Sequence, residues 1–439
     1  MESPSPTATT GVRFLIRALL HRNFRLYFAG QGISLIGTWI QQTAIGWLVY
    51  RLTNSPFLLG LVGFTGMVPT FILTPLAGVL ADRLDRRKLL VLTQVLAMAQ
   101  ALLLGGLALT GVIAFWQIVP LSLVMGAVNA LDAPTRQAFV LDMVERKEDL
   151  GNAIALNSSV FNGARLVGPS IAGMLIAAAG EGVCFVINGL SYLAVVAALV
   201  AMRVRPRPRG ATADSVLRGL VEGVRYAAHN EAIRAILLYL SLVSLVGMPY
   251  LVMMPVFARD VLHGGPHTLG FLLASAGIGA LVGALALAAR RSVVGLGRWI
   301  VRATCLFGAG QVAFGLSRVV WLSYALLVVT GCGMMVTMAS CNTMVQTIVE
   351  DDKRGRVMSL YTMAFMGMMP FGNLLVGFLA SRLGAPTSLI ISGSFCVALA
   401  LVSRHRLPRL RKGLQPIYAR LGLQMEPSAP PGTGVSTPR

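Results

Sequence analysis

An all-α polytopic membrane protein is the fold class that this sequence predicts. Only 12% of its 439 residues are charged, about half the share found in soluble proteins. Charge-free stretches cover residues 26–50, 52–81 and 89–131, and a helix needs about 20 apolar residues to cross the hydrocarbon layer. These runs are continuous, whereas a β-barrel would show alternating strands of about ten residues. We therefore expect helices, because lipid offers the backbone no hydrogen-bond partners.

Twelve apolar segments follow one another along the chain. The stretch 89–131 is too long for one crossing, so we expect two helices with a break near Thr110 and Gly111. Residues 1–11 are polar and do not resemble a cleaved signal peptide, because the first apolar run is too long. The predicted segments are 25–50, 55–80, 88–109, 115–140, 151–178, 182–202, 232–260, 268–289, 299–317, 319–348, 356–381 and 386–403.

The net charge of +20 admits two explanations. Basic surfaces bind nucleic acid, but Lys and Arg also accumulate at the cytoplasmic ends of membrane helices. With the N-terminus inside, 32 of the 37 Lys and Arg become cytoplasmic, and Arg165 lies within a span. The other four are Arg51, Arg259, Arg318 and Arg382. This split predicts two cytoplasmic termini, and charges spread over alternate loops argue against a nucleic acid partner.

A hydrophilic interruption separates six segments from six. It begins with RVRPRPR at 203–209, and apolar residues recur at positions 217, 220, 221 and 224. This spacing is typical of an amphipathic helix, either on the cytoplasmic leaflet or as an ordinary linker. The expected parts are a cytoplasmic tail at 1–22, a six-helix bundle at 23–203, a linker at 204–231, a second bundle at 232–404 and a largely disordered cytoplasmic tail at 405–439.

The two halves resemble each other weakly. At an offset of 205, Gly78, Arg86 and Gly126 correspond to Gly283, Arg291 and Gly331. Duplicated six-helix halves are typical of transporters, whose substrate site lies between the halves near the midplane.

Several motifs resemble the major facilitator superfamily of secondary transporters. GVLADRLDRRK at 78–88 is similar to its signature between helices 2 and 3, with Asp85 where a second Gly is commonest. NGARLVGPSIAG at 162–173 resembles the helix 5 signature of proton-coupled exporters, with Ala172 replacing one Gly. DAPTRQAFV and LVEGVRYAAHN resemble its enterobactin-exporter-like (transmembrane secretion effector) branch. The resemblance covers residues 20–405 and implies the major facilitator fold, with 12 transmembrane helices in two pseudo-symmetric six-helix bundles.

Six charges crowd into the seven residues 82–88. Four basic residues would serve as a plain cytoplasmic anchor, but acids contribute little to topology, so an anchor leaves the two aspartates unexplained. The resemblance implies a cytoplasmic latch, in which Asp82 faces the start of helix 11 and Arg86 pairs with Asp142. The residues of this candidate gate are Gly78, Asp82, Arg83, Arg86, Asp142, Gly355 and Arg356.

Helix 5 carries small residues around a proline. The motif consists of Gly163, Gly168, Pro169 and Gly173. Small residues permit close helix contacts and proline bends a helix. The motif therefore indicates either tight packing or a helix shaped to seal the path for export.

Arg165 is the charge that lies deepest in a predicted span, about 21 Å from its start at 1.5 Å per residue. Such a charge is a functional candidate. We expect Asp132 on helix 4 as its partner, because the two side chains lean toward each other; Arg136, one turn after Asp132, is the alternative. A purely structural pair is the favoured interpretation of these charges, and the alternative is that a buried Asp132 carries a proton during transport.

Uncharged amides and aromatic residues in the spans predict a cavity for an amphipathic or neutral solute, although any one amide could instead join helices. The candidates are Gln31, Trp39, Gln41, Gln42, Asn157, Asn162, Asn342, Gln346 and Asn373.

The predicted function is secondary transport by alternating access, as a proton-coupled exporter of a siderophore or drug-like compound. An importer or lysophospholipid transporter is the alternative, and a membrane enzyme or transport-dead sensor is more distant. No catalytic cluster or phosphate-binding loop appears, and His263 and His267 have no third metal ligand, so we expect no enzyme activity, no metal and no cofactor besides the proton-motive force. The expected protein is a monomer in the bacterial inner membrane, with a small-molecule substrate and the lipid bilayer as its partners.

Overall fold

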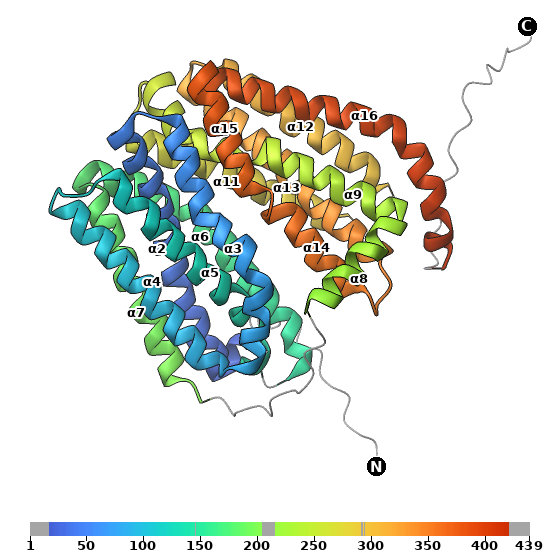
Figure 1. Ribbon diagram of the computed structural model, residues 1–439, viewed down its shortest axis with the longest axis horizontal. Coiled ribbons are helices and arrows are strands. Elements are labelled where there is room, and N and C mark those ends of the chain that lie inside the picture. The colour runs from blue at the N-terminus through green and yellow to red at the C-terminus, as the bar shows by residue number, and fades with distance from the viewer. Residues whose placement is uncertain (1–16, 145, 204–215, 291–292, 294, 421–439) are drawn as a thin grey trace, which may run out of the picture.

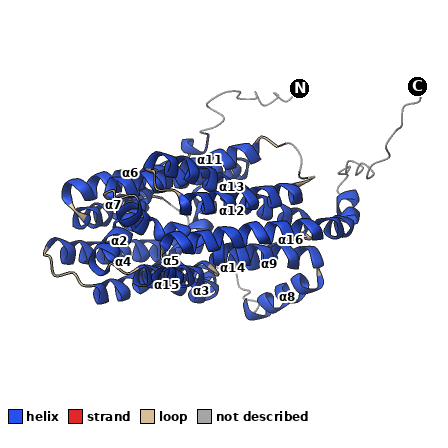
Figure 2. Ribbon diagram, turned by 90° about the horizontal axis from the view of Figure 1, so that it is seen from above, coloured by secondary structure: helices blue, strands red, loops and turns tan. Residues whose placement is uncertain are grey.

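The computed structural model describes residues 17–144, 146–203, 216–290, 293 and 295–420. Side chains are described for these residues except at 75–79, 81–83, 147, 216–220 and 406–420. The described part is helical, with no strand (Figure 2). Two groups of helices, α2–α7 and α9–α16, lie side by side and are joined through α8 (Figure 1). This arrangement matches the two predicted bundles.

The first bundle contains six long helices that follow a short 3₁₀ turn at Arg17–Leu20. They are α2 (Arg22–Thr53), α3 (Pro56–Arg83), α4 (Arg86–Leu109), α5 (Phe115–Met143), α6 (Leu150–Ala179) and α7 (Glu181–Ala201). Capping residues and a glycine account for where several of these helices begin and end. Ser55 caps α3 by accepting from the Leu58 amide, Asp85 caps α4 by accepting from the Lys88 amide, and Gly111 adopts a φ of 75° after α4, at the predicted break.

The second bundle contains less regular helices. The linker helix α8 (Val216–His229) leads to α9 (Glu231–Leu242), which continues as a π turn (Val243–Gly247), a 3₁₀ turn (Met248–Met253), α10 (Met254–Val256) and a second π turn (Phe257–Val261). The later helices are α11 (Pro266–Ala288), α12 (Leu296–Leu316), α13 (Val320–Ile348), α14 (Arg354–Met366), α15 (Met369–Leu383) and α16 (Ala385–Arg420).

The irregular region after α9 falls within predicted segment seven, and α14 with α15 make up segment eleven. Pro249 and Pro255 lack the N–H that a regular α-helix needs. In the same region the Gly247 carbonyl accepts a hydrogen bond from Gln311 Nε2 at 2.7 Å. Pro370 likewise begins α15 after the break at Gly367. The sequence predicted both crossings but not their interruptions.

Eleven helices in the described part are long and apolar enough to cross a membrane, against twelve predicted segments. The predicted segment missing from these eleven lies in α2. This helix has 32 residues, which is long enough to cross the membrane. Its glutamines reduce its hydropathy, and two of them, Gln31 and Gln41, are buried inside the protein. The twelfth helix is thus present, with polar residues turned toward protein.

The last helix differs from its predicted extent. We expected segment twelve to end at 403 and a largely disordered tail to begin at 405, but α16 continues to Arg420. Leucines at 407, 410 and 414 and an isoleucine at 417 keep helical spacing beyond the apolar run, and a helix does not have to end where the membrane does.

Candidate functional site

The two bundles touch at one end, where glycines allow the backbones of α3 and α15 to meet. We call this end, which carries Arg51, Arg259 and Arg382, the far end, and the end that carries the loop 84–88 the basic end. A Cβ on Gly60 would collide with the Asn373 carbonyl and lie 3.0 Å from the Gly377 Cα. No side chain fits there without separating the helices.

The helix 5 motif makes a second contact of this kind. On α6, a Cβ at Gly173 would lie 2.6 Å from the carbonyl oxygen of Pro266. On α11, a Cβ at Gly270 would lie 2.5 Å from that of Pro169. Gly168 faces its own half instead, where a Cβ would lie 2.5 Å from the Trp39 Cβ. Three of the four motif residues therefore serve tight packing, two of them between the halves.

Polar contacts join the halves at the far end. The Tyr50 hydroxyl at the end of α2 donates to the Asp260 carboxylate, which follows α10 in the chain. Arg259 donates to Asn54 Oδ1 at 2.7 Å, and its guanidinium lies 5.8 Å from the centre of the Tyr50 ring. We call these four residues the far-end latch. The sequence does not predict this latch, because 210 residues separate Tyr50 from Asp260 and nothing in the local pattern pairs them.

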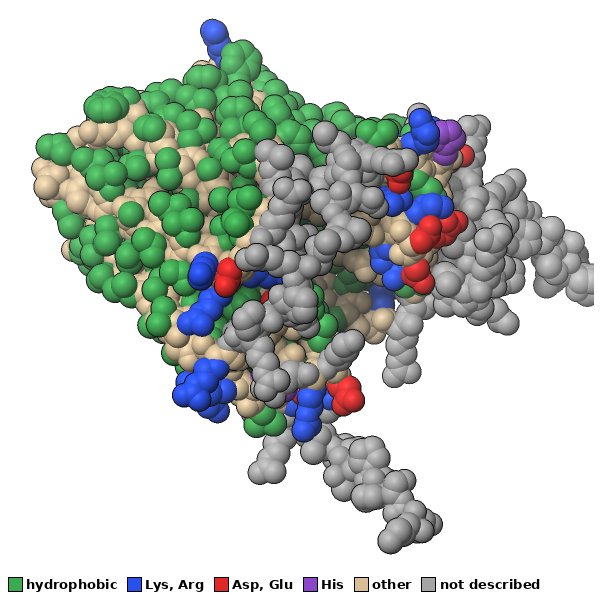
Figure 3. Space-filling view, turned by 60° about the horizontal axis from the view of Figure 1, so that its bottom comes forward, with side chains coloured by type: hydrophobic (Ala, Val, Ile, Leu, Met, Phe, Trp, Pro, Cys, Tyr) green, Lys and Arg blue, Asp and Glu red, His purple; other side chains and the backbone are tan. Residues whose placement is uncertain are grey.

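Toward the basic end the halves separate. Along α6, Gly163 has no described atom within 4 Å of a Cβ position, and Asn162 beside it is exposed. On α14, Gly355 is equally open, and Met366 is 47% exposed. The structure is therefore closed at the far end and open toward the basic end, where the charged side chains gather (Figure 3).

The predicted gate residues lie at this basic end. Arg86 Nη1 pairs with Asp142 at 3.1 Å, as predicted, and also approaches the Ala138 carbonyl. This pair joins α4 to α5 within one half. The side chains of Gly78, Asp82 and Arg83 lie outside the described residues.

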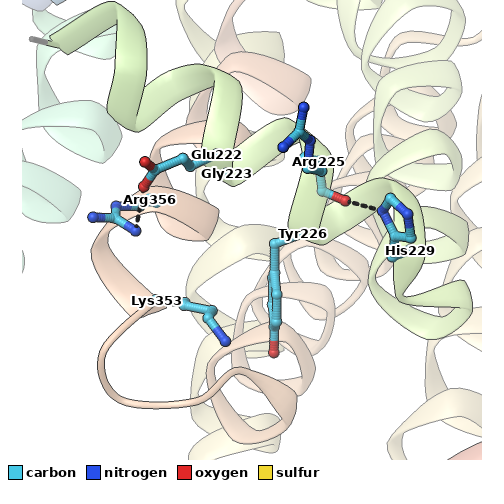
Figure 4. Close-up of a pocket in the computed structure, with 7 residues that line it drawn as sticks. All are labelled: Glu222, Gly223, Arg225, Tyr226, His229, Lys353 and Arg356. Carbon is cyan, nitrogen blue, oxygen red and sulfur yellow. Dashed lines mark hydrogen bonds and ion pairs between the residues drawn. The ribbon is translucent and has the colours of Figure 1, made fainter.

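Arg356 forms an ion pair with a carboxylate on the linker helix α8. Its Nη1 lies 2.8 Å from Glu222 Oε2 on α8, and a Cβ on Gly223 would lie 3.2 Å from the Arg356 Cβ. Lys353 Nζ lies 4.7 Å from the centre of the Tyr226 ring, and its hydrogen bond to Glu350 raises the Lys353 pKa. A pocket between α8 and α14 is lined by Glu222, Gly223, Tyr226, Lys353 and Arg356, together with Arg225 and His229 (Figure 4). The face of α8 opposite this contact exposes Val221 and Val224.

Asp132 is only 2% exposed and has a full set of partners. Arg136, one turn later on α5, forms an ion pair with it. Thr93 Oγ1 and Gln94 Nε2 of α4 donate to its Oδ1 at 2.9 Å and 2.7 Å. The predicted pair with Arg165 is wrong, and the alternative with Arg136 is what forms. The two α4 donors were not predicted.

Arg165 points elsewhere, because α6 packs on α2 and α11. Its guanidinium lies 5.9 Å from the centre of the Trp39 ring, and that ring meets Phe161 edge-on at 6.0 Å between centres. Among the described residues it has no hydrogen bond or ion pair.

The predicted cavity residues divide into two groups. Gln41 lies inside the first bundle, where it donates to Gln100 and accepts from Asn188, and Asn373 lies in the α3–α15 contact. These two join helices. Gln31 is buried, whereas the others are half-buried or exposed: Trp39, Gln42, Asn157, Asn162, Asn342 and Gln346.

Comparisons with known proteins agree with this geometry. A family model described as transmembrane secretion effector matches residues 16–420. The staphyloferrin A transporter of Staphylococcus aureus is 25% identical over 86% of this chain and 94% of its own length. Macrolide efflux protein A of Streptococcus pyogenes is 25% identical over 87% and 96%. A bacterial homologue of the human lysosomal transporter Spinster, in an inward-facing and unoccupied conformation, has the same fold, with a TM-score of 0.70 at 14% identity over 95% of this chain and 100% of its own.

Proposed function

Because the chain belongs to the transmembrane secretion effector family, we propose that it exports a small amphipathic molecule, such as a siderophore or drug-like compound, in exchange for protons. The family and its relatives are transporters, so this multi-pass membrane protein is a transporter and not an enzyme. Relatives named for staphyloferrin A transport and macrolide efflux support the choice of substrate class.

The observation that carries the proposal is the asymmetry between the two ends. Alternating access requires that one end be closed while the other is open. Here the glycine contacts and the far-end latch close one end, whereas Gly163 and Gly355 are open at the other. The distribution of Lys and Arg supports a cytoplasmic basic end and cytoplasmic termini, so this state would load substrate from the cytoplasm. We propose a monomer without a nucleic acid partner.

Asp132 is the proposed proton carrier. In the present state the Arg136 guanidinium and the donors on α4 favour the ionised carboxylate. A proton on Asp132 would therefore leave toward the cytoplasm in this state, and a proton from outside would bind when the far end is open. Inward proton movement would then accompany outward substrate movement, with Arg136 losing its partner each time Asp132 is protonated.

Everted membrane vesicles test this proposal. In vesicles acidified inside, a screen of siderophores and hydrophobic drugs should find a compound that enters the lumen while protons leave it. Asp132→Asn should abolish gradient-driven accumulation while retaining exchange of labelled for unlabelled compound. Asp351→Asn is the matched control, because the Asp351 side chain is 88% exposed. Full gradient-driven transport by Asp132→Asn would contradict the role of Asp132, and the absence of any proton-linked transport would contradict the proposed function.

A further inference from the structure

Arg165 is a half-buried charge that has no counter-ion among the described residues. Its guanidinium has the face of Trp39 at 5.9 Å but no hydrogen bond or ion pair with any described residue. By contrast, Asp132, which is buried in a span of the same half, has an ion pair and two donors. An arginine at membrane depth is costly, and intramembrane charges usually lie on a substrate or ion path. A ring face compensates only part of that cost, because it accepts none of the five N–H groups.

Arg165 lies where the contact between the two halves ends. From the far end inward, α6 contacts α11 at Gly173 and Gly270, and the Arg165 carbonyl is still 3.7 Å from a Cβ at Gly277. Half a turn farther, Gly163 has no described atom within 4 Å of a Cβ position, and Asn162 is exposed. Arg165 therefore lies at the closed apex of the opening, where a solute entering from the basic end would stop.

The Arg165 guanidinium, which has no counter-ion among the described residues, determines which chemical group would bind beside it. It presents several N–H donors and no acceptor, and a carboxylate accepts two such donors in parallel. A substrate that carries a carboxylate is therefore complementary to Arg165.

We propose that Arg165 binds the carboxylate of an amphipathic substrate whose apolar part lies against Trp39 and Phe161. This inference rests on the proposed function and specifies its substrate class. Phe161 is 45% exposed, so an aromatic surface stands beside the charge, as in pockets that combine apolar walls with a few polar groups. The same charge disfavours lipophilic cations of similar size.

Equilibrium binding with a matched pair of probes tests the inference. Pyrenebutyrate and its uncharged amide, pyrenebutanamide, differ only in charge, and transfer of tryptophan fluorescence to pyrene reports binding to the purified full chain in nanodiscs, with empty nanodiscs subtracted. The wild type should bind the carboxylate about tenfold or more tightly than the amide. Arg165→Gln should remove this preference and leave affinity for the amide unchanged, and Arg165→Lys should retain part of it.

Unchanged affinity for the amide also serves as the folding control for each variant. Equal affinity of the wild type for the two probes, no binding of either, or an undiminished preference in Arg165→Gln would overturn the inference. Binding does not require a proton gradient, so these outcomes are independent of the vesicle assay. A charge preference without proton-linked transport would refute the proposed function alone, and proton-linked transport without a charge preference would refute the inference alone.

Discussion

The far end and the basic end hold helices together in different ways. At the far end, Gly60 and Gly173 bring backbones of opposite halves into contact. At the basic end, the described ion pairs lie within a half: Arg86 with Asp142 joins α4 to α5, and Glu222 with Arg356 joins the linker helix to α14. The far end is thus closed by backbone contacts that tolerate no added atom, together with the far-end latch. At the basic end, these ion pairs hold neighbouring helix ends together while the halves stand apart.

A bulky residue at Gly60 should produce the largest change. Gly60→Leu would force α3 from α15, and overpacking of this kind costs about 1–3 kcal/mol, or about 5- to 150-fold in the equilibrium between the two states. Spin labels at the exposed residues Leu52 and Leu383 should show longer distances by double electron–electron resonance.

Gly66 provides the control for that change, because it lies on the same helix and no described atom lies within 4 Å of its Cβ position. Gly66→Leu should leave the label distances unchanged. If Gly60→Leu also left them unchanged, closure of the far end by backbone contact would be refuted.

Loss of one hydroxyl in the far-end latch should have an intermediate effect. Tyr50→Phe removes the donor to Asp260. A hydrogen bond to a charged group contributes about 1.5–3 kcal/mol, but the Asp260 side chain is 51% exposed, so we expect a shift toward the far-end-open state of about tenfold at most. The same label distances measure it.

Tyr27→Phe on the same helix is the matched variant, because the Tyr27 hydroxyl has no described partner. If Tyr50→Phe and Tyr27→Phe populate the far-end-open state equally, glycine packing alone closes this end.

Glu222→Gln should have the smallest effect. The side chains of Glu222 and Arg356 are 44% and 45% exposed, and exposed ion pairs contribute about 0.2–1 kcal/mol. Hydrogen–deuterium exchange of the α8 amides should accelerate by less than about fivefold, and less at high salt.

Glu231→Gln, which removes an exposed acid at the start of the neighbouring α9, should leave exchange in α8 unchanged. An equal acceleration in both variants would show that lost charge, rather than the lost contact with Arg356, loosens the linker helix.

The Arg86–Asp142 pair was implied by the family resemblance, and it is consistent with two residues that lie at predicted helix ends on the same side of the membrane. The Asp132–Arg165 pair could not be tested from the sequence. The depth of a residue along its helix does not determine toward which neighbouring helix its side chain points. Helix α6 turns residue 165 toward Trp39, and Arg136 already occupies the site next to Asp132. The partners of Tyr50 and Arg356 depend on packing between distant segments, which no local pattern records.

The sequence by itself determined the crossings and the side on which charge gathers, because lipid imposes length and hydropathy on each helix separately. Only the tertiary structure decided which end is closed, which acid pairs with which arginine, and that Arg165 has no counter-ion among the described residues. Those outcomes depend on how helices rotate and pack against one another, and a single helix carries no information about its neighbour's face.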